Sequence, residues 1–135
     1  MNTLQNFIAK HKITMSFDYS PTNPYVVDQD SEWAKCANHY KVVLKRPGKR
    51  FTSYYSMGCG LSRDPTCQDV LDSLRSESET IEREISFKNW ANDLGYNEYS
   101  IKALNSWRIS QRLSFKFIRF LGPQLYRELL ETERL

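Results

Sequence analysis

The fold is decided by HYKVVLKRPGKRFTSYYS, residues 39–56, in which apolar and polar side chains alternate on both sides of a Pro-Gly pair. Such alternation is typical of half-buried strands, and a Pro-Gly pair between two such runs predicts a hairpin. If the chain reverses at Pro47-Gly48, in a type II turn or a slightly more open loop, one face of the hairpin is apolar. Its facing pairs are Leu44 with Phe51, Val42 with Ser53, and Tyr40 with Tyr55. We therefore predict two antiparallel strands over residues 38–57.

The tip of this hairpin carries four cations, which are Lys45, Arg46, Lys49 and Arg50. In the predicted register Lys45 faces Arg50, and like charges opposite each other in a sheet are unfavourable. An anion at the tip would relieve this repulsion, so we predict that the four cations form a binding site. The alternative is a solvated turn whose charge discourages the addition of another strand.

The residues before the hairpin complete the sheet. Residues 4–8 have helical spacing of apolar side chains after a potential N-cap, Thr3. Residues 13–19 alternate between apolar and polar side chains, which predicts a further strand. Residues 20–33 are rich in proline and small polar residues and are expected to form a long loop. The first half is thus predicted to be a helix followed by a three-stranded antiparallel sheet.

The second half has helical periodicity. We expect one helix after Asp64 as N-cap, with an apolar stripe to Leu74 that fades in the polar residues beyond. A second should begin after Ser86, point Leu94 inward and end at Gly95. Two more are expected over residues 99–121 and 123–134, on either side of Gly122-Pro123. The prediction is a single α+β domain, residues 1–135, with the helix and sheet in residues 1–63 and a helical part in residues 64–135.

The long helix should have one wide apolar arc and one basic edge. Phe115 belongs to the arc that we expect to face the core. The basic edge consists of Arg108, Arg112, Lys116 and Arg119, and it is the second predicted binding surface.

Charge is distributed unevenly along the chain of 135 residues, whose formal net charge is +3. Residues 1–63 carry nine Lys/Arg against four Asp/Glu, or +5. Residues 64–85 carry two against seven, or −5, and residues 86–135 carry eight against five, or +3. A basic first half favours a phosphate-bearing or acidic partner, whereas the acidic middle would repel nucleic acid or counterbalance the basic parts.

Motifs of enzymes and cofactor sites are not recognisable. The two histidines, His11 and His39, lie in no nucleophile or acid-base pattern, and no phosphate-binding glycine loop occurs. Cys36, His39, Cys59 and Cys67 would be acceptable zinc ligands by type, but their spacing is not that of a zinc knuckle. We expect a non-enzymatic protein without a metal or cofactor.

Location is predicted from the cysteines and the hydropathy. Three cysteines, an odd number, without a secretion signal favour reduced thiols in a cytoplasm. No apolar run is long enough for a membrane span, so no membrane contact is expected.

One motif offers a different function, that of a small DNA-binding regulator. In residues 87–105, Ala91, Gly95 and Ile101 fall at the small, turn and buried positions of a helix-turn-helix. The exposed positions of its second helix, Asn97, Glu98, Ser100, Lys102 and Asn105, are a weak set for reading DNA. A plain helical hairpin produces the same pattern.

Four segments, in this order, resemble short accessory proteins of tailed phages and prophages. They are FIAKHKITM (7–15), YYSMGCG (54–60), PTCQDVLDSL (65–74) and SFKNWANDLGYNEYSIKA (86–103). Proteins of this kind include anti-CRISPR proteins and other inhibitors of host defence. The resemblance implies a phage-encoded inhibitor that acts by steric occlusion in the host cytoplasm, with a host protein or ribonucleoprotein complex as partner. It transfers no catalytic residue, and the basic charge excludes an acidic mimic of DNA.

Overall fold

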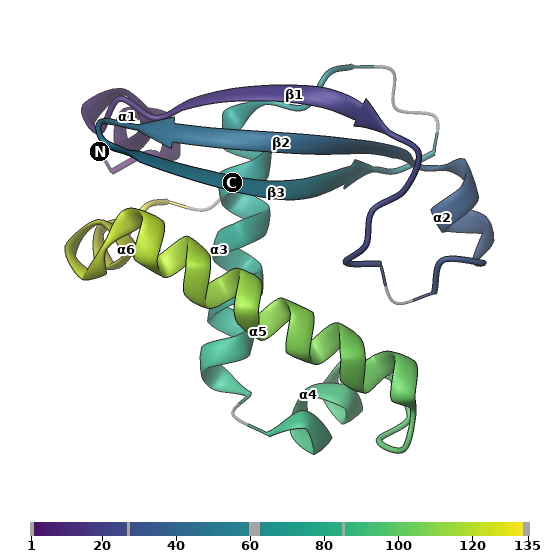
Figure 1. Ribbon diagram of the computed structural model, residues 1–135. Helices are drawn as coiled ribbons and strands as arrows, with labels where there is room; N and C mark the ends of the chain where they lie inside the picture. Colours follow the sequence, from purple (N-terminus) through teal and green to yellow (C-terminus); the bar gives the residue numbers. More distant parts are fainter. Residues whose placement is uncertain (1, 27, 60–62, 85, 134–135) are drawn as a thin grey trace.

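The computed structural model describes residues 2–26, 28–59, 63–84 and 86–133, and it confirms the α+β class. A three-stranded sheet lies above the helices α3, α5 and α6 (Figure 1). The elements of the described residues, in chain order, are α1 (Leu4–Lys10), β1 (Thr14–Ser20), α2 (Glu32–Cys36), β2 (Asn38–Arg46), β3 (Lys49–Met57), α3 (Cys67–Arg83), α4 (Phe87–Asp93), α5 (Ile101–Leu121) and α6 (Pro123–Leu130).

The sheet has the order β1-β2-β3, and both neighbouring pairs are antiparallel. The predicted hairpin register is confirmed, since Leu44 pairs with Phe51 and Lys45 with Arg50. Gly48 has a φ of 75°, which the third position of a type II turn requires and which glycine adopts without strain. The alternation in the sequence therefore fixes which side chains of β2 and β3 face the helices.

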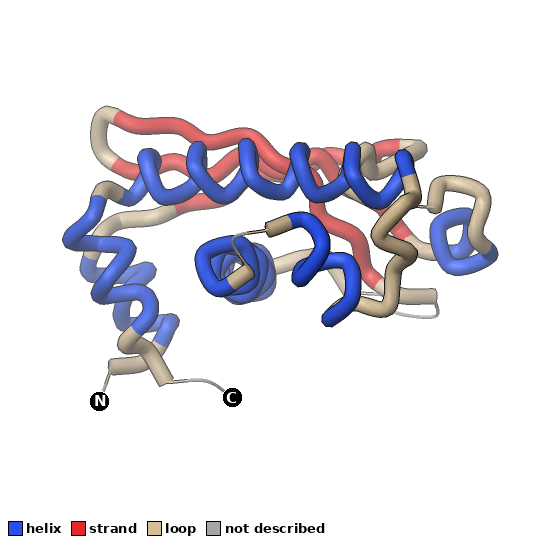
Figure 2. Tube along the Cα trace, turned by 90° about the horizontal axis from the view of Figure 1, so that it is seen from below, coloured by secondary structure: helices blue, strands red, loops and turns tan. Residues whose placement is uncertain are grey.

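The core lies between the inner face of the sheet and the helices. Tyr40, Val42 and Leu44 of β2 are almost completely buried, and they share one hydrophobic cluster with residues of α3, α5 and α6. Seen from below, α5 extends roughly along the strands, and its C-terminal end lies near the β2–β3 turn (Figure 2). This placement brings the hairpin tip to the end of α5.

Helix α3 is longer than the sequence predicted. It continues to Arg83 because its inner face stays buried through Ser78 and Ile81, although the surrounding residues are polar. Its N-cap is Thr66 and not Asp64, since the Thr66 side chain accepts a hydrogen bond from the backbone N–H of Asp69. Both expectations, the early fading and the Asp64 cap, were wrong.

A second, smaller cluster holds α4 against α3 and α5. Its buried members are Ile81, Trp90, Ala91 and Ala103. The predicted cap at Ser86 is confirmed, and Gly95 has the positive φ expected after a helix end. Leu94, however, was expected to point inward and is half exposed, because α4 ends at Asp93 and the chain turns away from the core there.

Among the described residues, no helix combines the length and the apolar character that crossing a membrane would require.

Candidate functional site

A groove of about 500 Å³ lies where the hairpin tip meets the C-terminal half of α5. Its residues come from β3 and α5, and we call it the basic groove. They are Lys49, Arg50, Phe51, Thr52, Lys116, Arg119 and Phe120. Two of its four cations belong to the predicted tip and two to the predicted edge of the long helix. The structure thus joins two surfaces that the sequence presented as separate.

Two tip cations anchor the hairpin to α5. Arg46 Nε donates a hydrogen bond to the carbonyl oxygen of Phe120 at 2.8 Å, and its Nη2 donates to that of Leu121 at 3.1 Å. Lys49 Nζ donates to the carbonyl oxygen of Arg119 at 3.2 Å. The last carbonyl groups of a helix lack partners within it, and cations are favourable there. Of the four tip cations predicted to form a binding site, Arg46 and Lys49 therefore already have hydrogen-bond partners at the end of α5.

The physical reason lies in the alternation of the strands. Arg46 and Lys49 face each other across the hairpin and lie on the same face as Leu44 and Phe51, which points toward the helices. The alternation in the sequence could have revealed this, because side chains two residues apart share a face.

Aromatic rings form the floor of the basic groove. Phe51 and Phe120 are both buried, with ring centroids 5.8 Å apart. The Arg46 guanidinium lies 5.9 Å from the centroid of the Phe120 ring, within the range of a cation–π interaction. The floor is thus fixed by packing, while Arg50 and Lys116 are exposed at the walls.

The other predicted site residues lie outside the groove. Lys45 is exposed and faces Arg50 on the outer face of the hairpin. Arg108 and Arg112 are exposed on α5, at steps of four residues from Lys116, so these side chains follow one face of the helix. We call Arg108, Arg112, Lys116 and Arg119 the basic ridge; its last two members also line the basic groove.

Phe115 was missed as a surface residue. It was expected in the core, but it is 55% exposed. It lies three residues after Arg112 and four before Arg119, so it shares their face of α5. Its position at the margin of the basic arc on the helical wheel, next to Arg108, was the available indication.

The ion pairs identified among the described residues include no cation of the basic groove or basic ridge. The ion pairs found there involve other basic residues, which are Lys10, Arg63, Arg75 and Arg83. Helix α5 contains five Lys/Arg and no Asp/Glu, whereas α3 contains five Asp/Glu and two Lys/Arg. Positive charge therefore gathers on α5 and negative charge on α3.

One carboxyl group of α3 does contact α5. Ser110 Oγ donates a hydrogen bond to Glu77 across the interface of the two helices. Burial raises the pKa of Glu77, and the hydrogen bond from Ser110 opposes this in part.

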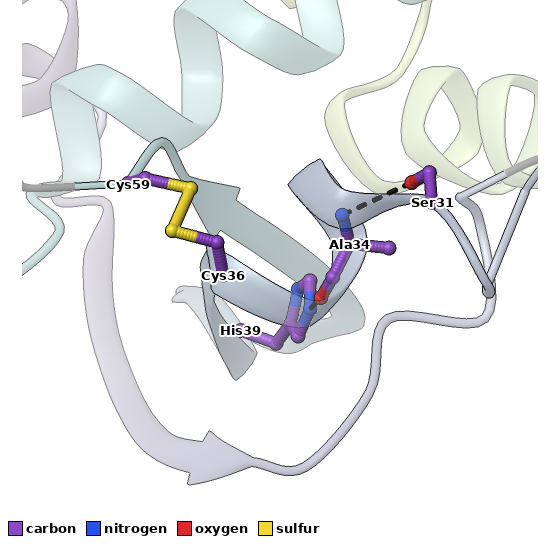
Figure 3. The surroundings of a disulfide bond; sticks show 5 residues. All are labelled: Ser31, Ala34, Cys36, His39 and Cys59. Atoms are coloured by element: carbon purple, nitrogen blue, oxygen red, sulfur yellow. Dashed lines mark hydrogen bonds between the residues drawn. A yellow bond between two sulfur atoms is a disulfide. The ribbon is translucent and has the colours of Figure 1, made fainter.

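Two cysteines form a bond at the opposite end of the sheet (Figure 3). Cys36, at the end of α2, is joined to Cys59, which follows β3, and their Cα atoms are 5.4 Å apart. The expectation of reduced thiols was wrong for this pair, because the loop before β2 returns to the end of β3. Cys67 is free, and burial raises its pKa to about 11.

His39 lies next to this bond and is held on both sides. Its Nδ1 is 2.6 Å from Ser56 Oγ, and its Nε2 is 2.6 Å from the carbonyl oxygen of Ala34. Of the four residues weighed as zinc ligands, three are thus already engaged with partners in the chain. The described residues contain no group of three or more His, Cys, Asp or Glu side chains arranged to hold a metal ion.

The candidate helix-turn-helix departs from that motif. Residues 94–100 separate α4 from α5, whereas the motif has a turn of about three or four residues. Ile101, expected to be buried, is the first residue of α5 and is 75% exposed. Asn97 and Glu98 precede the helix on which they were expected. This geometry is that of a plain helical hairpin.

No family model matches the chain, and neither a curated protein nor a solved structure matches it significantly.

Proposed function

We propose that the chain is a non-enzymatic binding protein that docks its basic groove and basic ridge on an anionic macromolecule. The observation that carries this proposal is the convergence of Lys49 and Arg50 with Lys116 and Arg119 on one groove. Like charges so placed repel one another, and no carboxylate among the described residues forms an ion pair with them. An anionic partner would relieve the repulsion and gain charge-assisted hydrogen bonds.

A macromolecular partner fits better than a small anion. The basic groove continues into Arg112 and Arg108, and the distance along α5 from Arg108 to Arg119 is about 16 Å at 1.5 Å per residue. A single phosphate would meet only part of this surface.

The role that we propose for this binding is steric occlusion of a host defence complex. The support is the resemblance of four segments to phage accessory proteins, among which inhibitors of CRISPR systems occur. The partner would then be an acidic groove of a host protein or the RNA of a ribonucleoprotein, and the site of action the host cytoplasm.

The binding can be tested by the salt concentration at which the purified chain elutes from immobilised heparin, a polyanion. The test variant is Arg50→Glu with Lys116→Glu, which spares Arg46 and Lys49 and their hydrogen bonds to α5. The matched control is Lys35→Glu with Lys88→Glu, exposed lysines of α2 and α4. We expect the test variant to elute at clearly lower salt than the control, which has the same net charge. Equal shifts would show that net charge alone is responsible, and would contradict the proposal.

The inhibitory role needs a separate experiment in cells. The chain is expressed in bacteria with an active CRISPR system, and the plating efficiency of a targeted phage is measured. We expect the wild type and the Lys35→Glu, Lys88→Glu control to raise plating, and the Arg50→Glu, Lys116→Glu variant to lose this effect. If the Arg50→Glu, Lys116→Glu variant inhibits as well as the wild type, inhibition does not depend on the basic groove and this part of the proposal is wrong.

A further inference from the structure

The exposed face of α5 combines a row of cations with one aromatic ring. Phe115 is 55% exposed and lies between Arg112 and Arg119, one helical turn from each. The other large aromatic residues in this half of α5, Phe117 and Phe120, are buried. An exposed ring flanked by arginines is a combination that is enriched where proteins bind bases or partner side chains.

The charge pattern of this face identifies the chemistry of its ligand. Arg108, Arg112 and Lys116 follow one another at steps of four residues, and like charges so placed disfavour the helix. The core of a surface that binds another protein is usually depleted of charged residues, and of lysine in particular. Helix α5 carries no Asp or Glu along its whole length, so a ligand with repeated negative charge fits it best.

The spacing of the cations along the basic ridge also allows an extended polyanion to contact several of them in succession. Four residues of helix rise about 6 Å, so Arg108, Arg112 and Lys116 offer a cation at each turn. The basic groove adds Lys49 and Arg50 at the end of this row. A strand whose phosphates follow these cations would bring a base to the Phe115 ring.

We propose that the basic ridge and basic groove bind single-stranded nucleic acid, with one base stacked on Phe115. This inference rests on the proposed function and names the ligand of the same surface. A single strand is favoured over a duplex because only an unpaired base presents a free face to an aromatic ring. An acidic protein segment would also be attracted by the cations, but it would give Phe115 no stacking partner.

The test is fluorescence anisotropy with a labelled single-stranded oligonucleotide of about ten residues, at several salt concentrations, beside the same sequence as a duplex. We expect the single strand to bind more tightly than the duplex. Phe115→Ala should weaken single-strand binding by about tenfold or more without changing the salt dependence, and Phe115→Trp should retain it. Arg112→Ala should instead reduce the slope of log K against log salt by about 0.7, the value for one lost phosphate contact.

Two control variants separate stacking from general effects. Ile101→Ala removes a 75% exposed apolar side chain from the same helix, outside the ridge, and should leave binding unchanged. Lys88→Ala removes an exposed cation from α4 and should change the salt slope little.

The outcomes distinguish this inference from the function on which it rests. If heparin retention depends on Arg50 and Lys116 but no single strand binds at low salt, the nucleic-acid inference is overturned and an acidic protein partner remains. If the Phe115→Ala variant binds the single-stranded oligonucleotide as tightly as the wild type does, the proposed stacking of a base on Phe115 is wrong. If the duplex binds more tightly than the single strand, the choice of ligand is wrong.

Discussion

At the scale of single residues, Arg46 connects the two halves of the basic groove. Its guanidinium donates hydrogen bonds to the carbonyl oxygens of Phe120 and Leu121, 74 and 75 residues further along the chain. We predict that Arg46→Ala lowers the free energy of unfolding by about 1–3 kcal/mol, because hydrogen bonds from a charged donor are lost and carbonyl groups at the end of α5 lose their partner. Urea denaturation followed by circular dichroism measures this loss.

The neighbouring Lys45 provides the control for this prediction. It is exposed and lies on the outer face of the hairpin, so Lys45→Ala should change the free energy of unfolding by less than about 0.5 kcal/mol. The two substitutions remove the same charge from adjacent residues. Equal effects on stability would mean that Arg46 acts through charge alone and does not hold the tip to α5.

At the scale of elements, helix α3 depends on its N-terminal cap. Thr66 Oγ1 accepts a hydrogen bond from the N–H of Asp69 at 3.1 Å, and Asp69 Oδ2 accepts one from the N–H of Thr66 at 2.9 Å. We predict that Thr66→Ala costs about 1 kcal/mol of stability, since it removes one half of this capping box. Thermal unfolding, compared with the wild type, gives the difference.

A second threonine of α3 serves as the control. Thr80 lies inside the helix and donates its hydroxyl proton to the carbonyl oxygen of Ser76 at 2.9 Å. Alanine has the higher helix propensity, so Thr80→Ala should be neutral or slightly stabilising. If Thr80→Ala lowers stability as much as Thr66→Ala does, the effect at Thr66 does not come from its role as the N-cap.

Helix α3 also shows where sequence periodicity stops being informative. The apolar stripe predicts its first half correctly, but further along the core positions are occupied by Arg75 and Ser78, which are almost completely buried. Ser78 accepts a hydrogen bond from Tyr126 at 3.1 Å, and Arg75 donates to the hydroxyl group of Thr132. Their partners lie in or just beyond α6, so no local pattern could indicate that these polar residues have hydrogen-bond partners inside the protein.

At the scale of the whole molecule, the sequence predicts the sheet and the cations of the site, but not that these cations converge on one groove. The register of β2 with β3 follows from local alternation around Pro47-Gly48, and it was predicted correctly. The basic groove depends on how the end of α5 packs against the hairpin, which is a contact between distant segments. Composition indicated an uneven charge along the chain, and the structure packs the acidic helix α3 against the basic helix α5, with a hydrogen bond from Ser110 to Glu77 between them.

The bond between Cys36 and Cys59 bears on the whole molecule because it ties the loop before β2 to the end of β3. The two cysteines are 23 residues apart, and both are exposed, so thiol reductants in solution can reach the bond. Chain-entropy arguments give a loop of this length a stabilisation of about 3 kcal/mol, through restriction of the unfolded state. We predict that a thiol reductant lowers the melting temperature of the Cys67→Ser variant, in which other pairings are impossible within one chain.

The matched variant is Cys36→Ser with Cys59→Ser, which should melt at the temperature of the reduced protein whether or not reductant is present. The basic groove lies at the other end of the sheet, so heparin retention should not change when the bond is reduced. If the melting temperature of the Cys67→Ser variant is the same with and without reductant, Cys36 and Cys59 are thiols in solution. A loss of heparin retention on reduction would show instead that the two ends of the molecule are coupled through the sheet.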